Sequence, residues 1–131
     1  MKQLISSGTP WEDLVGYSRA VRIGDRVEVS GTTAVDGDEL IGEGDAYQQT
    51  HFIIRKIERA LSEAGASLAD VVRTRMYVTT RNVVEDVLRA HGDFFTSIRP
   101  AATMVIVSGL IDERLLVEIE VSAILGAHSD H

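Results

Sequence analysis

Apolar residues recur at three- and four-residue spacing in the segment that follows residue 50, as on one face of a helix. The residues of this stripe are Ile53, Ile57, Ala60, Leu61 and Ala64. Asp45 followed by Gln48 predicts the start of this helix, because an N-cap carboxylate satisfies free amide groups of the first turn. Gly65 predicts the end of this helix, because glycine is the residue most often found just after a helix C-terminus.

A second helical stripe follows Asn82, which forms the spacing of a capping box with Glu85. The stripe consists of Val84, Val87, Leu88, His91, Phe94 and Phe95. Pro100 ends the connection that follows, because proline cannot continue a helix. The sequence therefore predicts two amphipathic helices.

The remaining apolar runs are rich in β-branched residues, several alternate with polar ones, and all are bounded by turn residues, as strands are. Gly24-Asp25 predicts a tight hairpin, and Asp36-Gly37-Asp38 and Gly42–Asp45 predict turns. The predicted strands are Lys2–Ile5, Ser18–Gly24, Arg26–Gly31, Val71–Thr79, Thr103–Val107 and Leu115–Leu125. The order β-β-β-α-β-α-β-β predicts an α+β fold in which two helices cover one face of a mixed sheet.

The last predicted strand leaves the other face of that sheet unexplained. One side of the strand is wholly apolar, and the opposite side mixes apolar groups with Glu118 and Glu120. Such a face should not lie fully in water, and self-association would cover it. The chain shows no repeat, low-complexity run or linker, so we expect a single domain over residues 1–131.

Composition and charge narrow the function. The 131 residues include no cysteine, which removes disulfides, thiol nucleophiles and thiolate metal sites. Thirteen basic against twenty acidic residues give a net charge of −7, so no nucleic-acid partner is expected. No apolar run approaches the roughly 20 residues of a membrane span, and residues 1–16 lack the pattern of a secretory leader. We therefore expect a cytoplasmic protein without a membrane partner.

The sequence contains no recognisable motif for binding a metal or a cofactor, so we expect neither. His51, His91, His128 and His131 lack ligand spacing with acidic neighbours. Neither a phosphate-binding glycine loop nor a Gly-x-Ser-x-Gly nucleophile motif is present.

Several local strings, taken in their order, resemble the reactive intermediate deaminase (Rid or YjgF) superfamily over nearly the whole chain. These strings are Gly16-Tyr17-Ser18-Arg19-Ala20-Val21, Val29-Ser30-Gly31-Thr32, Ala64-Gly65-Ala66-Ser67-Leu68-Ala69-Asp70-Val71-Val72, Phe94-Phe95, Arg99-Pro100-Ala101 and Val117-Glu118-Ile119-Glu120. The resemblance implies a chorismate-mutase-like (YjgF-type) fold and a homotrimer with three clefts between subunits. Members bind small carboxylate-bearing molecules there and hydrolyse enamines or imines to keto acids and ammonia without a cofactor.

The resemblance also implies roles for individual residues. Tyr17, Ser30, Gly31 and Glu118 match the family's pattern, and Glu118 stands where a glutamate positions water. The family's carboxylate-binding arginine is replaced by Ala102. An asparagine of the second helix is replaced by Leu88. Because an arginine–carboxylate pair is bidentate and charge-assisted, its loss implies an altered substrate scope.

Each candidate residue has a possible structural role as well as a possible functional role. Arg99 could reach the cleft or be solvated, and His91 could transfer protons or simply pack. Tyr17 could donate a hydrogen bond or only pack, and Glu118 could bind water or be a solvated surface carboxylate. Ser30, Gly31 and Thr32 could bind a carboxylate through hydroxyl and amide groups. Near the missing arginine, Ala102, Thr103 and Leu88 predict a more apolar cleft.

Two functional hypotheses follow. The first is a Rid-family hydrolase that converts a reactive enamine or imine to a keto acid or another carbonyl compound plus ammonia. The second is a non-catalytic trimer that binds a small molecule in the same cleft. An RNA-directed activity, sometimes attached to this family, is disfavoured by the acidic balance.

Overall fold

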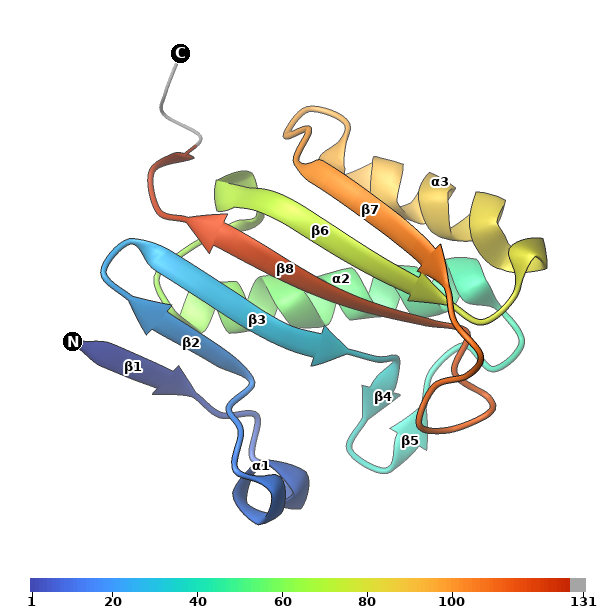
Figure 1. The fold of residues 1–131 in the computed structure, drawn as a ribbon, viewed down its shortest axis with the longest axis horizontal. Coiled ribbons are helices and arrows are strands. Elements are labelled where there is room, and N and C mark those ends of the chain that lie inside the picture. Colours follow the sequence, from blue (N-terminus) through green and yellow to red (C-terminus); the bar gives the residue numbers. More distant parts are fainter. Residues whose placement is uncertain (128–131) are drawn as a thin grey trace.

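The computed structural model describes residues 1–127 and has the predicted α+β arrangement, with one mixed six-stranded sheet (Figure 1). The strand order is β1-β2-β3-β8-β6-β7, and only β6 and β7 run parallel. The strands are β1 (Lys2–Ile5), β2 (Ala20–Ile23), β3 (Arg26–Thr32), β6 (Val71–Val78), β7 (Ala101–Ile106) and β8 (Val117–Ile124).

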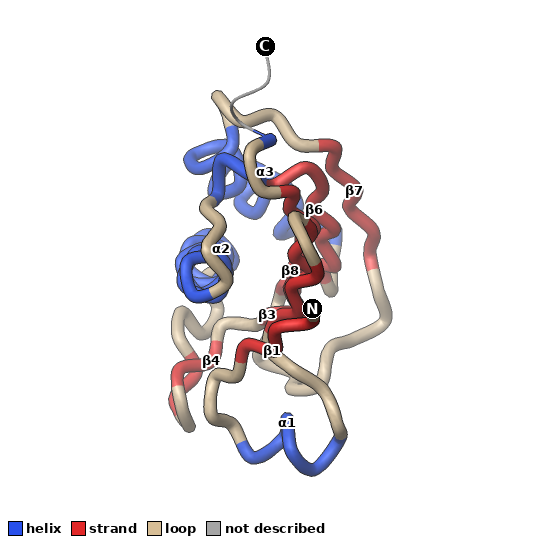
Figure 2. Tube along the Cα trace, turned by 90° about the vertical axis from the view of Figure 1, so that its left-hand side faces the viewer, coloured by secondary structure: helices blue, strands red, loops and turns tan. Residues whose placement is uncertain are grey.

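Two helices, α2 (Ala46–Glu63) and α3 (Val84–Phe95), cover one face of this sheet (Figure 2). Ile53, Ile57 and Leu61 of α2 are at most 1% exposed and pack against the buried face of β8. The buried side chains of β8 are Val117, Ile119, Val121 and Ala123. The predicted apolar alternation of the last strand is therefore confirmed.

The face of the sheet away from the helices carries a polar network that runs across β3, β8 and β6. Tyr77 Oη donates to Glu120 Oε1 at 2.8 Å, and Ser122 Oγ donates to Glu28 Oε1 at 2.6 Å. Arg75 adds an ion pair to Glu120 at 3.6 Å. These contacts pair part of the polar side chains on this face, which we call the open face, within one chain. Glu118 lies on the same face.

Two predicted helix starts have different outcomes. Asp45 caps α2, because its carboxylate accepts from the Gln48 amide at 3.0 Å. The capping box predicted for Asn82 and Glu85 is wrong. Thr80 instead accepts from the Asn82 amide at 3.3 Å and begins the short 3-10 helix η2 (Arg81–Val83), so the chain enters α3 already turning.

The pattern missed three short elements: α1 (Pro10–Val15), β4 (Val35–Asp36) and β5 (Glu39–Leu40). The apolar residues of α1 stay exposed, so α1 has no buried stripe to reveal it. The predicted turn at Asp36-Gly37-Asp38 is confirmed as the connection between β4 and β5. A further 3-10 helix, η1 (Leu68–Asp70), precedes β6.

Strand boundaries also shift. β2 begins two residues after Ser18, and β7 spans Ala101–Ile106 in place of Thr103–Val107. β8 begins at Val117, because the Leu115 amide closes a turn with the Asp112 carbonyl at 3.0 Å. The Gly24-Asp25 hairpin is confirmed by the pairing of Ile23 with Arg26.

Within residues 1–127, no helix is long and apolar enough to cross a membrane. The same part of the chain holds no group of three or more acidic or histidine side chains placed to bind a metal ion. Two of the four histidines, His128 and His131, lie outside the described residues.

Gln49 attaches α2 to the segment that leads into β8. Its buried side chain donates to the Gly42 and Arg114 carbonyls at 3.1 and 3.0 Å, and accepts from the Leu116 amide at 2.9 Å. Replacement by leucine leaves these backbone groups without their partner, so we expect Gln49→Leu to lower the free energy of unfolding by about 3 kcal/mol. Urea unfolding beside the exposed Gln48→Leu variant measures this difference. Equal losses in both variants would contradict the role of Gln49.

Candidate functional site

The Glu118 carboxylate lies directly against the backbone of Gly31. Val29 pairs with Val121 and Thr32 with Ile119, so β3 contains one extra residue at a β-bulge. A Cβ atom added at Gly31 would lie 2.1 Å from Glu118 Oε2. Only a glycine leaves room for the carboxylate at this point of the bulge.

Glu118 is half-buried, and burial raises the pKa of its carboxyl group, because the charged form loses hydration. The nearby Arg19 opposes this shift, while the Glu120 carboxylate adds to it. Among residues 1–127, no group donates a hydrogen bond to the Glu118 carboxylate. Its oxygens are therefore available to a water molecule or a ligand.

Arg19 joins this group of residues, although sequence reasoning did not select it. Its Nη2 donates to the Gly31 carbonyl at 2.7 Å, and its own carbonyl accepts from the Ser30 amide at 3.0 Å. Arg19 thus fixes the bulge from β2 and places a positive charge near Glu118. A basic residue two positions after Tyr17 was the signal that could have identified it.

The hydroxyl groups beside Glu118 are already partly used. Ser30 Oγ donates to the Ser18 carbonyl at 2.7 Å, and the buried Thr32 Oγ1 donates to the Ser30 carbonyl at 2.8 Å. Both therefore stabilise the bulge and reach a ligand only through their lone pairs or after changing partners. Tyr17 is 40% exposed, and within the described chain its hydroxyl makes no hydrogen bond.

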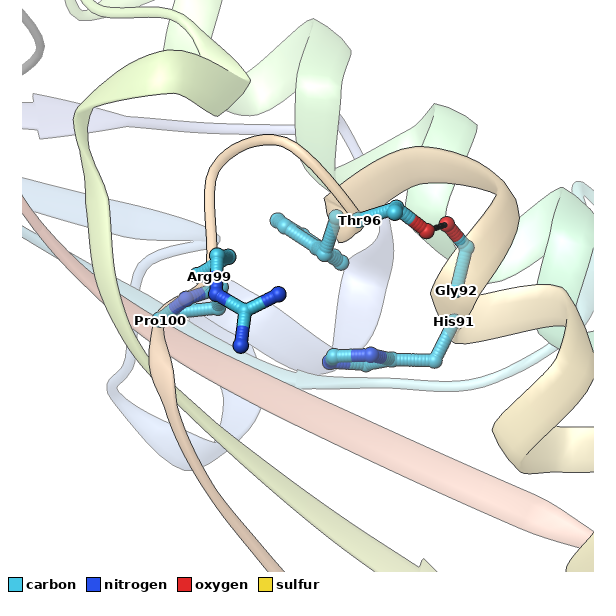
Figure 3. A pocket seen from close by; sticks show the side chains of 6 residues that line it. His91, Gly92, Thr96, Arg99 and Pro100 are labelled. Carbon is cyan, nitrogen blue, oxygen red and sulfur yellow. Dashed lines mark hydrogen bonds between the residues drawn. The ribbon is translucent and has the colours of Figure 1, made fainter.

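A second group of predicted residues surrounds an open cavity of about 380 Å³ at the end of α3 (Figure 3). Figure 3 shows the Arg99 and His91 side chains extending into this opening from two sides. Gly92, Phe95, Thr96 and Pro100 complete the lining. The structure therefore brings His91 and Arg99 together, as a shared role requires.

Arg99 is held in an unusual backbone conformation. Its φ is 58°, in the left-handed region that favours glycine, and it directly precedes Pro100. Its amide donates to the Phe95 carbonyl at 2.8 Å, which closes the turn after α3. This turn aims the guanidinium group at the cavity.

The His91 ring is held in one orientation by its contacts, and its partly buried position favours the neutral form. Its Nε2 shares a hydrogen bond of 3.0 Å with Thr74 Oγ1, and its ring lies 4.6 Å from the Phe95 ring centroid. Burial lowers the pKa of His91 below its ordinary value of 6.5.

Leu88, Ala102 and Thr103 lie nearby but do not line the cavity of His91 and Arg99. Leu88 is 47% exposed on α3, so its place in the predicted apolar stripe is wrong. Ala102 and Thr103 are exposed on the edge strand β7, where Arg73 donates to Thr103 Oγ1. Ala102 and Thr103 thus lie on an open strand edge, where Arg73 is the neighbouring positive side chain.

The two groups of candidate residues belong to opposite faces of the sheet. Glu118 pairs with Tyr77 on the open face. Thr74, three residues earlier in β6, points to the other face, where it contacts His91 of α3. One chain therefore cannot present Glu118 and His91 to the same small molecule.

Acid should destabilise the protein in part through His91. Because the pKa of His91 is lowered on folding, the unfolded chain takes up the proton first. The stabilisation is complete above about pH 6.5 and is lost progressively as the pH falls below it. We expect His91→Asn to show a smaller decrease in unfolding free energy between about pH 7.5 and about pH 5.5 in urea titrations. An unchanged decrease would contradict this account.

Comparison with known proteins places the chain. Residues 10–125 match the family model described as Endoribonuclease L-PSP. An uncharacterized protein of Streptomyces coelicolor is 46% identical over 123 residues, covering 94% of this chain and 92% of that protein. A 3-aminoacrylate deaminase RutC of Acinetobacter baylyi is 31% identical over 117 residues, covering 88% of this chain and 91% of that protein.

Solved structures agree with these relatives. A crystal structure from Mycobacterium tuberculosis, described as a member of the YjgF/YER057c/UK114 family, is 48% identical and superposes with a TM-score of 0.85. The match covers 95% of this chain and all of that one. Both the predicted fold class and the predicted superfamily are confirmed. The chain belongs to the Endoribonuclease L-PSP family, which is the YjgF or Rid superfamily that its local strings resemble.

Proposed function

We propose that this protein hydrolyses a reactive enamine or imine to a carbonyl compound and ammonia. The observation that carries the proposal is the Glu118 carboxylate, which is half-buried, without a hydrogen-bond donor among residues 1–127, and packed against Gly31. A relative named 3-aminoacrylate deaminase supports the reaction class, since 3-aminoacrylate is an enamine. RNA cleavage is not proposed, because the net charge of −7 opposes binding to a phosphate backbone.

The reaction needs one group that exchanges protons close to the C=N bond. Protonation of an enamine at carbon by Glu118 gives the iminium ion, and the oxygen of water then adds to the iminium carbon. One proton moves from that oxygen to nitrogen, the C–N bond breaks and ammonia leaves. The remaining hydroxyl proton returns to the Glu118 carboxylate as the C=O bond forms. Glu118 is suited to these transfers, because its raised pKa favours a carboxyl group that both gives and accepts a proton.

The cleft is proposed to form between subunits of a homotrimer. Glu118, Gly31 and Arg19 would come from one chain, and His91 and Arg99 from the next. This arrangement explains why one chain presents the two groups on opposite faces of its sheet. It also covers the exposed edge strand β7.

The substrate is proposed to be larger or less charged than a small 2-imino acid. Ala102 and Leu88 place apolar side chains where the family carries an arginine and an asparagine. Arg99 is the positive side chain nearest in sequence to this position, and it enters from the α3–β7 connection. A carboxylate-bearing ligand would therefore be held from a different direction.

A non-catalytic, ligand-binding trimer is the second candidate. The observation that favours it is the engagement of Ser30 and Thr32 with backbone carbonyls, which removes two donors from the site. Together with Ala102, this leaves fewer groups to bind an anionic substrate.

A trapping assay separates the two candidates. An amino-acid oxidase generates imines from a panel of small, branched and aromatic amino acids, semicarbazide traps them, and a hydrolase reduces the trapped amount. We expect the protein to reduce trapping most with large side chains. In Ala102→Arg, we expect activity on small 2-imino acids to rise at least about tenfold, because the charged pair is restored.

Ala101→Arg is the matched control, because Ala101 lies on the same strand but points to the other face. It should leave the preference unchanged. Unreduced trapping with every amino acid, for the unmodified protein and for Ala102→Arg, would contradict the hydrolase and favour the ligand-binding trimer.

A further inference from the structure

A second cavity, of about 190 Å³, lies between α2 and the segment that follows β1. It is separate from the cavity of His91 and Arg99, and with the Glu118 group it shares only Arg19. Its lining consists of Ser6, Ser7, Arg19, Lys56, Arg59, Ala60 and Glu63.

Three positive side chains meet at this cavity without an ionic partner. Among residues 1–127, no carboxylate lies within 4.0 Å of the charged nitrogens of Arg19, Lys56 or Arg59. Arg19 Nε is buried and has no hydrogen-bond partner. Lys56 Nζ donates to the Val35 carbonyl at 2.8 Å, which leaves its other two N–H groups free.

The positive charges of Arg19, Lys56 and Arg59 repel one another in a partly buried environment. Burial is the main cause that lowers the pKa of Lys56, and Arg19 lowers it further. Asp36 opposes this shift, while the effects of Arg59, which lowers the pKa, and Glu12, which raises it, are smaller. A bound anion would relieve this repulsion and accept hydrogen bonds from the charged side chains that line the cavity.

The neighbouring acidic group does not fill that role. Glu12 is 4% exposed, and it accepts hydrogen bonds from Ser6 Oγ at 2.8 Å and from the Ser7 amide and hydroxyl. Both serine hydroxyl protons are therefore used, and the donors that remain for a ligand belong to the three cations.

We propose that this cavity binds the phosphate group of a small phosphorylated molecule. Its lining carries three positive side chains and one negative one, a net charge of +2 that matches a phosphate dianion better than a single carboxylate. Arg19 directly precedes β2, and Lys56 and Arg59 belong to α2. Their nitrogen donors line one cavity, as the recognition of a phosphate group by several donors requires.

Titration with inorganic phosphate, followed by calorimetry and by amide NMR shifts, tests the site. We expect saturable binding with a dissociation constant of about 1 mM or tighter. Arg59→Gln should weaken it at least about tenfold, because one charge-assisted contact is lost. Glu63→Gln should tighten it by a few-fold, because a repelling carboxylate is removed.

Arg55→Gln is the matched control, because it removes the same charge from the same helix. Arg55 pairs with Glu58 and lies over the Phe94 ring, outside the cavity. It should change phosphate affinity less than about twofold. Acetate should bind at least about tenfold more weakly than phosphate.

Absence of saturable binding would overturn the proposal, and so would equal weakening by Arg55→Gln and Arg59→Gln, or acetate binding as tight as phosphate binding. Imine hydrolysis by Arg59→Gln should equal that of the unmodified protein. The phosphate site and the proposed hydrolase therefore stand or fall separately.

Discussion

Glu118→Gln is expected to reduce imine hydrolysis by about 10²–10⁴-fold while the fold stays intact, because the amide cannot exchange a proton with water or nitrogen. The change preserves shape, and no hydrogen bond to the carboxylate is lost within the described residues. The rate constant from the trapping assay measures the loss. Urea unfolding shows whether stability is retained.

Glu120→Gln is the control for this variant. Glu120 lies two residues further along the same face of β8, where it pairs with Arg75 and accepts from Tyr77. Loss of such a partly exposed pair costs up to about 1 kcal/mol of unfolding free energy. Because Glu120 is given no proton transfer in the reaction, its effect on rate should stay below about fivefold. Similar rates for Glu118→Gln and Glu120→Gln would contradict the catalytic role of Glu118.

Gly31→Ala is expected to reduce the rate by about 10²-fold, because the new methyl group displaces the Glu118 carboxylate, which we propose to be catalytic. The added Cβ would lie 2.1 Å from Glu118 Oε2 and 3.1 Å from its Cδ, so the side chain of Glu118 must move. Overpacking of this kind should also lower the free energy of unfolding by about 1–3 kcal/mol. Trapping assays and urea unfolding measure the two effects.

Gly109→Ala provides the comparison, because a Cβ at Gly109 would meet no atom within 4 Å. It should leave both rate and stability unchanged. In a background of Glu118→Ala, Gly31→Ala should cost little stability, since the clash disappears. A Gly31→Ala variant with full activity would refute the close packing of Glu118 on the bulge.

The main elements of the fold were predictable because their residues bury one face. The stripe of α2 and the alternation of β8 are spaced by the helix and strand periods, so burial alone reveals them. The six residues of α1 lack such a stripe, since Trp11 and Leu14 are exposed. The start of α3 was missed because Thr80, two residues before Asn82, makes the capping contact and begins η2.

The site was predictable only where single residues match the family's strings. Glu118 and Gly31 were chosen separately, and their contact depends on a register shift between β3 and β8 that residue spacing does not encode. Arg19 was missed for the same reason, because it reaches Gly31 across the β2–β3 pair. The local sequence pattern also does not indicate whether a side chain contributes to a cleft of its own chain or to a cleft shared with a neighbouring subunit.

Subunit mixing tests most directly whether one cleft is built from two chains. Glu118→Gln disables the open-face group, and Ala102→Trp blocks the strand edge at β7, so each variant alone should be inactive. After joint refolding in equal amounts, about one cleft in four combines two intact halves, and activity should return to about a quarter of the unmodified level. Activity that stays at the level of the separate variants, in oligomers shown by native mass spectrometry to contain both chains, would contradict the shared cleft.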